Sequence, residues 1–122
     1  MTIETRTAFD VDAYKRAYEN WDVETLLSLY ADDVEQIQMD DATPPREPGT
    51  YRGKERLAQM FGHCRDNGVK ATVENLVPGT ERAAATVTCE FPTGRRVVAN
   101  VILDLREGKI ARELVTAARD AE

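Results

Sequence analysis

The chain has 122 residues, a length typical of one domain, and its apolar fraction of 42% is too high for a disordered chain. Its 22 Asp and Glu residues outnumber its 16 Lys and Arg residues, and the resulting charge of −6 excludes a general binder of nucleic acid or anionic membranes, which needs a basic surface. No apolar run approaches the roughly 20 residues of a membrane span, and charged Glu4 and Arg6 stand where a signal peptide would be apolar. We therefore expect a single cytoplasmic domain over residues 1–122, with its core at about 8–118 and with neither nucleic-acid nor membrane partners.

Two helices are predicted at the start of the chain. Residues 9–20 carry apolar side chains at helical spacing, which is the pattern of an amphipathic helix. Asp22 is a suitable N-cap for a second helix. The apolar side of that second helix consists of Val23, Leu26, Leu29 and Tyr30.

The middle of the chain is predicted to hold a strand, an irregular connection and a third helix. Residues 34–39 show no helical stripe and are expected to be extended, whereas residues 40–49 hold three of the five prolines and predict an irregular loop or a wide hairpin connection. Gly53 opens the third helix, and Asn67 and Gly68 close it. The apolar stripe of this helix consists of Leu57, Met60, Phe61 and Cys64.

After Gly68 the pattern changes from helical spacing to alternation. Segments near 69–77, 82–91, 95–105 and 110–117 alternate, and short turns rich in glycine separate them. Such turns imply antiparallel hairpins. Helices followed by a meander of strands predict an α+β fold with the helices on one face of a curved sheet.

Several kinds of chemistry lack the residues they need. Ser28, the only serine, stands in a predicted helix without the Gly-x-Ser-x-Gly context of a serine nucleophile. His63, the only histidine, has no partner at ligand spacing, so we predict no metal site and no cofactor. Cys64 and Cys89 are expected to be reduced core thiols. Any chemistry must therefore come from Tyr, Asp, Glu, Asn and Gln side chains.

Three runs of sequence, in order, resemble the nuclear transport factor 2-like superfamily. They are Tyr14–Val34, Tyr51–Phe61 and the turn Glu107–Ile110, and together they extend over nearly the whole chain. The resemblance implies a cystatin-like α+β barrel, in which a cone-shaped, curved antiparallel sheet wraps around three helices of the N-terminal half and leaves an internal pocket open at one end. Small bacterial members include ketosteroid isomerases and SnoaL-like polyketide cyclases, so the resemblance implies a small, largely apolar ligand and cofactor-free proton transfer.

Alignment with ketosteroid isomerase identifies candidate catalytic residues. Tyr14 falls on the tyrosine donor of that enzyme, but its base falls on Gln38 and its acid on Ile102, so true ketosteroid isomerase activity is not supported. A longer loop after Gln38 leaves Asp40 as one candidate base, and Glu113 is the other. Glu113 is either a solvated strand residue or an interior base whose pKa is raised by burial.

The resemblance implies that Tyr14 donates a hydrogen bond to a carbonyl or developing oxyanion while Asp40 or Glu113 removes a proton. The other side chains predicted to contact the ligand are Tyr18, Gln38, Met60, Phe61, Cys89, Asn100 and Ile102. The alternative is a non-catalytic ligand-binding or dimerisation module in which the pocket is vestigial.

The segment 95–105 admits two interpretations, because its alternate residues form an unbroken apolar face and a mixed face. By pattern alone, the apolar face is the core. By the resemblance, the mixed face with Asn100 and Ile102 lines the pocket, and the apolar face lies outside and needs a partner. This second interpretation predicts a homodimer through the outer sheet face. The residues at the centre of that interface are Val97, Ala99, Val101 and Leu103.

Overall fold

The structure is a computed structural model that describes residues 8–121 and contains three helices and one six-stranded sheet. The helices are α1 (Val11–Glu19), α2 (Val23–Ser28) and α3 (Glu55–Asp66). The strands are β1 (Tyr30–Met39), β2 (Gly49–Arg52), β3 (Lys70–Val77), β4 (Arg82–Glu90), β5 (Arg96–Arg106) and β6 (Lys109–Arg119).

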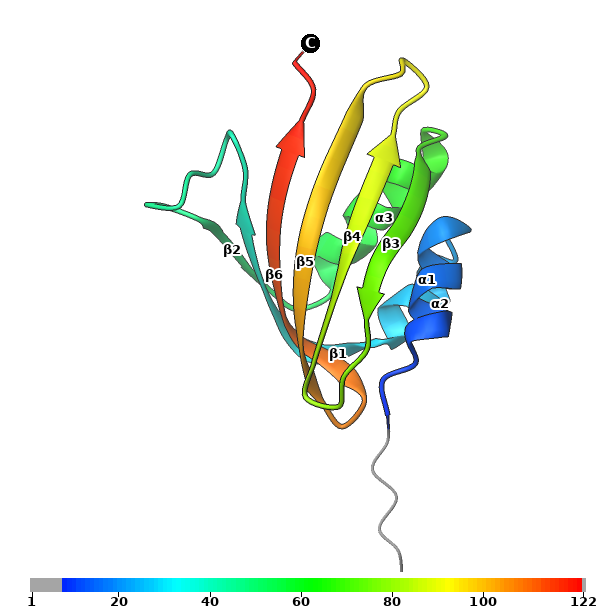
Figure 1. Ribbon diagram of the computed structural model, residues 1–122, viewed down its shortest axis with the longest axis vertical. Helices are drawn as coiled ribbons and strands as arrows, with labels where there is room; N and C mark the ends of the chain where they lie inside the picture. Colours follow the sequence, from blue (N-terminus) through cyan, green and yellow to red (C-terminus); the bar gives the residue numbers. More distant parts are fainter. Residues whose placement is uncertain (1–7, 122) are drawn as a thin grey trace, which may run out of the picture.

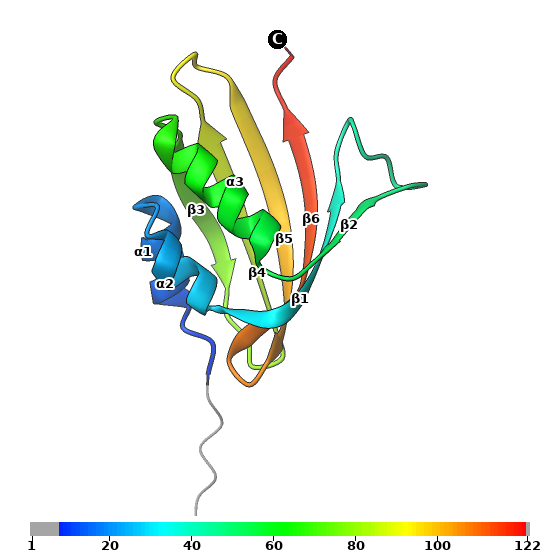
Figure 2. The ribbon, with the colours of Figure 1, turned by 180° about the vertical axis from the view of Figure 1, so that it is seen from behind.

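The sheet has the strand order β2-β1-β6-β5-β4-β3, and it is curved without closing on itself (Figure 1). The described helices lie together on one side of the sheet, which is the near side in Figure 2. The predicted α+β fold, with a curved sheet around three helices, is confirmed. The sheet is not wholly antiparallel, because β1 pairs with β6 in parallel.

Two of the sequence-based expectations concern a signal peptide and membrane-spanning segments. Glu4 and Arg6, on which the expected absence of a signal peptide depends, lie outside the described residues. Within residues 8–121, no helix combines the length and the apolar character that a membrane crossing requires.

Helices α1 and α2 each begin at an aspartate cap. The Asp10 carboxylate accepts a hydrogen bond from the Ala13 N–H at 2.9 Å, and the Asp22 carboxylate accepts one from the Thr25 N–H at 3.3 Å. These bonds satisfy donors that have no partner inside a helix. The predicted capping role of Asp22 is therefore confirmed.

Helix α2 is shorter than predicted, and Tyr30 belongs to strand β1. The helix ends at Ser28, and Tyr30 pairs with Ile110 of β6. The placement of Tyr30 on the helix was wrong because apolar side chains at the end of a short stripe suit a buried strand equally well. As a result, the fully buried Tyr30 side chain enters the interior from the sheet and not from a helix.

Helix α1 is fastened to the free edge of β3. The N–H of Val73 donates to Glu19 Oε2 at 2.9 Å, and its carbonyl accepts from Lys15 Nζ at 2.7 Å. Lys15 and Glu19 also form an ion pair at 2.8 Å. These bonds satisfy backbone groups that an edge strand would otherwise expose. They also hold α1 in the orientation that buries Tyr14.

Strand β2 was not predicted from the sequence. It follows directly on the proline-rich connection, and its four residues are too few to display an alternating pattern. It pairs with β1 so that Tyr51 lies opposite Gln36. This pairing brings side chains from the start of α3 close to β1.

The two faces of β5 decide between the two interpretations of its pattern. Val101 and Leu103 are 5% and 0% exposed, whereas Val98 and Ile102 are 40% and 42% exposed. The apolar face is therefore the core, as the pattern alone predicts, and the inverted assignment taken from the resemblance is wrong. Strand β5 lies between β4 and β6, and the helices cover only one face of the sheet. The face of β5 with more apolar side chains is the one buried under them, because that burial removes more apolar surface from water. The predicted dimer stripe thus lies on the inner face, with Val101 and Leu103 buried and Val97 and Ala99 half-buried.

Candidate functional site

A buried carboxyl group lies on the inner face of the sheet. Glu113 of β6 is 4% exposed, so of its two predicted placements the structure has the interior one. Its Oε2 accepts a hydrogen bond from Tyr30 Oη at 2.7 Å, and its Oε1 accepts one from Gln36 Nε2 at 2.8 Å. Burial raises the pKa of Glu113, and the two hydrogen bonds offset part of this effect. A raised pKa brings a carboxyl group closer to the neutral range, where it can both take and release a proton.

The hydroxyl of Tyr14 lies in the same interior and has no hydrogen-bond partner among residues 8–121. The side chain is completely buried and packs against Phe9 and Tyr18, with ring centroids 5.7 and 5.5 Å away. Burial, and secondarily the charge of Glu113, raises the pKa of Tyr14 well above its ordinary value. The hydroxyl therefore stays protonated. Since buried polar groups are nearly always paired, this donor calls for an acceptor that residues 8–121 do not provide.

Aromatic rings surround these polar groups. The Tyr18 and Phe61 rings lie 5.5 Å apart in an edge-to-face arrangement, and the Tyr30 and Phe61 rings lie 6.2 Å apart. Trp21 packs on the outside of the same cluster, 5.5 Å from Tyr18. The rings packed around Tyr14 are thus apolar, which favours a largely apolar ligand beside its hydroxyl.

Side chains from β2 and α3 extend the hydrogen-bonded chain outward from Glu113. Arg56 Nη1 donates to Gln36 Oε1 at 2.9 Å, and the Arg56 guanidinium carbon lies 3.5 Å from the centre of the Tyr51 ring. Sequence reasoning did not identify Arg56, Tyr51 or Tyr30 as site residues. For Arg56 and Tyr51 there was no local signal, because their proximity depends on the unrecognised strand β2.

The inner face becomes more exposed toward one end of the sheet. Along β5 the side chains change from fully buried Leu103 to half-buried Val97, and along β6 they change from buried Glu113 to half-buried Ala117. Gln38, on the inner face of β1, is also half-buried. The inner face is therefore more accessible to solvent at this end than beside Glu113.

The structure brings most of the predicted ligand contacts to the interior. Phe61 is buried there, and the half-buried residues are Tyr18, Gln38, Met60 and Cys89. Asn100 and Ile102 lie on the outer face, where Asn100 Oδ1 accepts a hydrogen bond from Thr86. Their predicted contact with an interior ligand was wrong, because it depended on the inverted faces of β5.

Both cysteines are free thiols, as predicted. They are half-buried, and burial raises the pKa of Cys89 to about 11. Each thiol therefore stays protonated near neutral pH.

A sequence profile described as the SnoaL-like domain matches residues 11–113. The chain belongs to this SnoaL-like domain family. The match confirms the family resemblance that the sequence runs indicated, and a search of the curated proteins finds no match to the chain.

Solved structures share the fold of this SnoaL-like domain at low sequence identity. A nuclear transport factor 2-like protein of unknown function from Burkholderia xenovorans superposes with a TM-score of 0.72 at 17% identity, over 92% of this chain and 82% of that one. A protein from Kribbella flavida, provisionally named a ketosteroid isomerase, gives 0.68 at 20% identity over 92% and 76%. A protein from Pseudomonas putida, provisionally named a polyketide cyclase, gives 0.64 at 22% identity over 86% of each chain.

Asp40 of this SnoaL-like domain is tied into the loop after β1. Its carboxylate accepts hydrogen bonds from Gln38 Nε2 at 2.9 Å and from both the N–H and the hydroxyl of Thr43 at 2.8 Å. These bonds, that of Gln38 first, lower the pKa of Asp40 to about 2. A carboxylate held so firmly in its ionised form is a weak base. Of the two candidate bases, Glu113 is therefore the better suited to accept a proton from a ligand.

Replacing Asp40 by Asn should destabilise the SnoaL-like domain at pH 7 by about 1–3 kcal/mol, the usual worth of hydrogen bonds to a charged group. Because the folded-state pKa is depressed, this contribution is present above the ordinary value of 3.8 and is lost as the pH falls through about 2. Urea unfolding at pH 7, 4 and 2 should therefore show the variant and the wild type converging at the lowest pH. Asp41→Asn, which alters an exposed ion pair with Arg119, is the control and should cost less than about 1 kcal/mol. If the loss of stability in Asp40→Asn did not change with pH, the depressed pKa of Asp40 would be contradicted.

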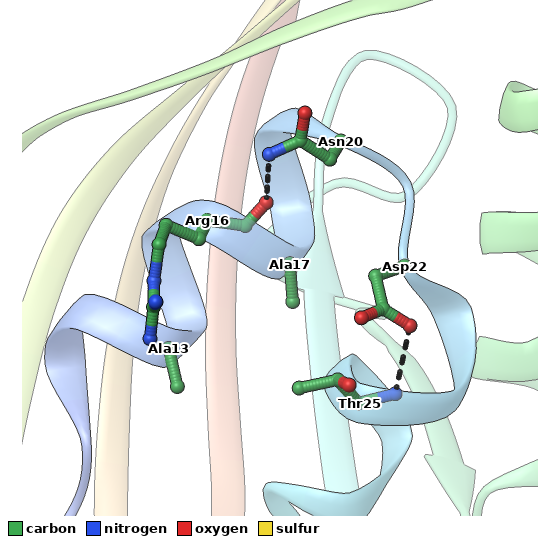
Figure 3. A pocket seen from close by; sticks show the side chains of 6 residues that line it. All are labelled: Ala13, Arg16, Ala17, Asn20, Asp22 and Thr25. Atoms are coloured by element: carbon green, nitrogen blue, oxygen red, sulfur yellow. Dashed lines mark hydrogen bonds between the residues drawn. The ribbon is translucent and has the colours of Figure 1, made fainter.

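Two depressions on the described surface of the SnoaL-like domain lie away from Glu113, each with a volume of about 430 Å³. The first lies between α1 and α2 and is lined by Ala13, Arg16, Ala17, Asn20, Asp22 and Thr25 (Figure 3). Polar groups there are already used, since Asp22 caps α2 and Asn20 Nδ2 donates to the Arg16 carbonyl at 2.8 Å. The second is lined by Ala31, Asp32, Asp33, Arg106, Glu107 and Lys109. Neither depression includes Glu113 or Tyr14.

Proposed function

We propose that this SnoaL-like domain binds a small, largely apolar carbonyl compound among its interior aromatic rings and catalyses cofactor-free proton transfer. The C–H bond next to the carbonyl breaks, its proton passes to the Glu113 carboxylate, and the electron pair moves into an enolate. The Tyr14 hydroxyl donates a hydrogen bond to the oxygen on which the charge develops. If the enolate is conjugated with a C=C bond, return of the proton from Glu113 to the far carbon of that dienolate completes an isomerisation. If the enolate carbon instead attacks a second carbonyl of the same molecule, a C–C bond forms, the oxygen of that carbonyl takes the proton back from Glu113, and a cyclisation is complete.

The observation that carries the proposal is the buried Tyr14 hydroxyl, which has no partner among residues 8–121 and lies in the same interior as a buried carboxyl group. A continuous set of ring contacts joins the two groups: Tyr14 packs on Tyr18, Tyr18 and Tyr30 both pack on Phe61, and the Tyr30 hydroxyl donates to Glu113. The provisional names of the Kribbella and Pseudomonas proteins support an activity of the isomerase or cyclase type.

One observation favours a second candidate function, non-catalytic ligand binding. Both carboxyl oxygens of Glu113 already accept hydrogen bonds, from Tyr30 and from Gln36. In a purely structural cluster, Glu113 would hold these side chains in place and the ligand would bind unchanged. Proton exchange in a bound ketone separates the two candidates, because only the first requires Glu113 to change its protonation state.

Tyr14→Phe tests the donor role, and its effects on stability and on binding should have opposite signs. Removing an unpaired buried hydroxyl should raise the free energy of unfolding by about 1 kcal/mol. Removing a hydrogen bond to an ionised oxygen should weaken binding of 4-nitrophenolate about 10- to 100-fold, which corresponds to about 1.5–3 kcal/mol. Urea unfolding and a titration that follows the absorbance of 4-nitrophenol measure the two quantities.

Tyr30→Phe is the matched control, because it also removes one buried tyrosine hydroxyl. That hydroxyl is bonded to Glu113 at 2.7 Å, so its loss should lower the stability. A Tyr14→Phe variant that melts earlier than the wild type and binds 4-nitrophenolate equally well would make Tyr14 a structural residue and would remove the basis of the proposal.

Homodimerisation through the outer sheet face stays a prediction, as does a cytoplasmic location. Val98 and Ile102 are the large apolar side chains that β5 offers on that face. The stripe from which the dimer was predicted lies on the inner face, so Val98 and Ile102 are the apolar side chains of β5 that such an interface would contain.

A further inference from the structure

The amide of Gln36 is held between two groups of opposite hydrogen-bonding character. Arg56 can only donate, and an ionised carboxylate can only accept. Gln36 Oε1 receives the bond from Arg56 at 2.9 Å, and Gln36 Nε2 gives the bond to Glu113 Oε1 at 2.8 Å. Rotating the amide by half a turn would place its NH₂ group against the Arg56 guanidinium and its oxygen against the carboxylate. Only the observed orientation makes both bonds.

The orientation of this amide matters for the protonation state of Glu113. With Nε2 directed at Glu113, the amide stabilises the ionised carboxylate. With Oε1 directed at Glu113, the amide would instead accept a hydrogen bond from the protonated acid. The geometry points to Arg56 as a positioning residue that, through the amide of Gln36, keeps Glu113 ionised and thus able to act as a base. This inference rests on the proposed function, in which Glu113 takes a proton from the ligand.

Strand β2, the turn at Gly53 and the first turn of α3 together hold Arg56 in this position. The Tyr51 ring lies under its guanidinium, 3.5 Å from the guanidinium carbon, and the pairing of β2 with β1 sets Tyr51 opposite Gln36. Gly53, with a φ of 87°, makes the turn from β2 into α3, so that Arg56 falls in the first helical turn. A residue with a side chain is strained at such a φ. The arrangement is therefore built into the path of the backbone between β2 and α3.

The titratable groups that face Glu113 come from helix α1 and strand β1. Tyr14 and Tyr18 on α1 and Tyr30 on β1 all have their pKa raised by burial, so they remain neutral. The residue that pairs with Glu113 on β5 is Leu103, which carries no charge. Arg56 on α3 is the cation that reaches Glu113 through a single intervening side chain. Its removal is therefore the change most able to alter the proton affinity of Glu113 without touching the carboxyl group.

Arg56→Met tests the inference in the full chain without any ligand. The pKa of Glu113 is followed by carbon-13 NMR of its side-chain carboxyl, assigned by its disappearance in Glu113→Gln. We expect Arg56→Met to raise this pKa by about one unit, as loss of a donor to the ionised form should. Arg56→Lys keeps a donor-only side chain and should stay close to the wild type. Arg52→Met removes an exposed arginine of β2 that pairs with Glu35 at 3.0 Å, and it should leave the pKa unchanged.

A double-mutant cycle distinguishes positioning from a direct effect of charge. In a Gln36→Met background the connecting amide is absent, so adding Arg56→Met should shift the pKa of Glu113 no further. An equal shift with and without Gln36 would overturn the inference, and so would an unchanged pKa in folded Arg56→Met. Melting temperatures close to that of the wild type establish that each variant is folded.

The inference and the proposed function can fail separately. If Arg56→Met leaves the pKa of Glu113 unchanged while Glu113→Gln abolishes proton exchange, the positioning role is wrong and the proposed function stands. If Arg56→Met raises the pKa but Glu113→Gln exchanges protons as fast as the wild type, the positioning geometry is right and the proposed function is wrong.

Discussion

Val101→Glu is expected to unfold the domain at neutral pH. Val101 is 5% exposed on the inner face of β5, and it pairs with Val115 of β6, which is also buried. Placing an unpaired carboxylate there costs several kcal/mol, against a total stability of about 5–15 kcal/mol for a typical domain. Circular dichroism at pH 7 should show loss of the cooperative melting transition. At acidic pH, where the new carboxyl is neutral, part of the transition should return.

Ile102→Glu, one residue along the same strand, is the control. Its side chain is 42% exposed on the outer face, so the added charge remains in water and the melting temperature should change little. Unfolding in Ile102→Glu together with a stable, monomeric Val101→Glu would restore the inverted assignment of the faces. Light scattering on Ile102→Glu also tests the dimer prediction, since a charge on this face should disrupt a dimer that depends on it.

Glu113→Gln is expected to slow the exchange of α-protons in a bound apolar ketone by about 10²- to 10⁴-fold, the usual contribution of a general base. The probe is 2-tetralone in D₂O, and proton NMR measures its loss of signal with and without the protein. Binding of 4-nitrophenolate should be retained, since a neutral amide resembles the protonated state that Glu113 reaches after it has taken a proton. Glu35→Gln, a neighbouring glutamate on the opposite face of β1, should leave the exchange rate unchanged. Equal rates in Glu113→Gln and the wild type would favour non-catalytic binding.

The raised pKa of Glu113 gives this prediction a definite pH dependence. Exchange should increase as the pH rises through the folded-state pKa, which lies above the ordinary value of 4.5, because only the ionised carboxyl accepts a proton. Stability should change in the opposite sense. A group whose folded-state pKa is raised favours folding most below 4.5, and that contribution is lost as the pH rises through the folded-state value. Urea unfolding of Glu113→Gln should lack this decline.

The sequence by itself determined the elements whose signals are local. The Asp22 cap, the helical stripe of α1 and the alternation of the last four strands follow from contacts within a few residues, and these elements form where they were predicted. The pattern of β5 also predicted its own core correctly. The error came from imposing the faces of a related fold on this strand, which moved Asn100 and Ile102 to the wrong side.

The tertiary structure alone decided the site. Glu113 could have been solvated, and its burial depends on which side of β6 the helices cover. Tyr30 reaches Glu113 only because α2 ends early and β1 pairs with β6, and Arg56 reaches Gln36 only because the four-residue β2 turns the chain back along β1. Each of these contacts joins residues far apart in the chain, so no local propensity encodes it. The physical reason is that the hydrogen bonds of a buried carboxyl group are set by which segments the fold packs around it, and that choice is made by the whole core at once.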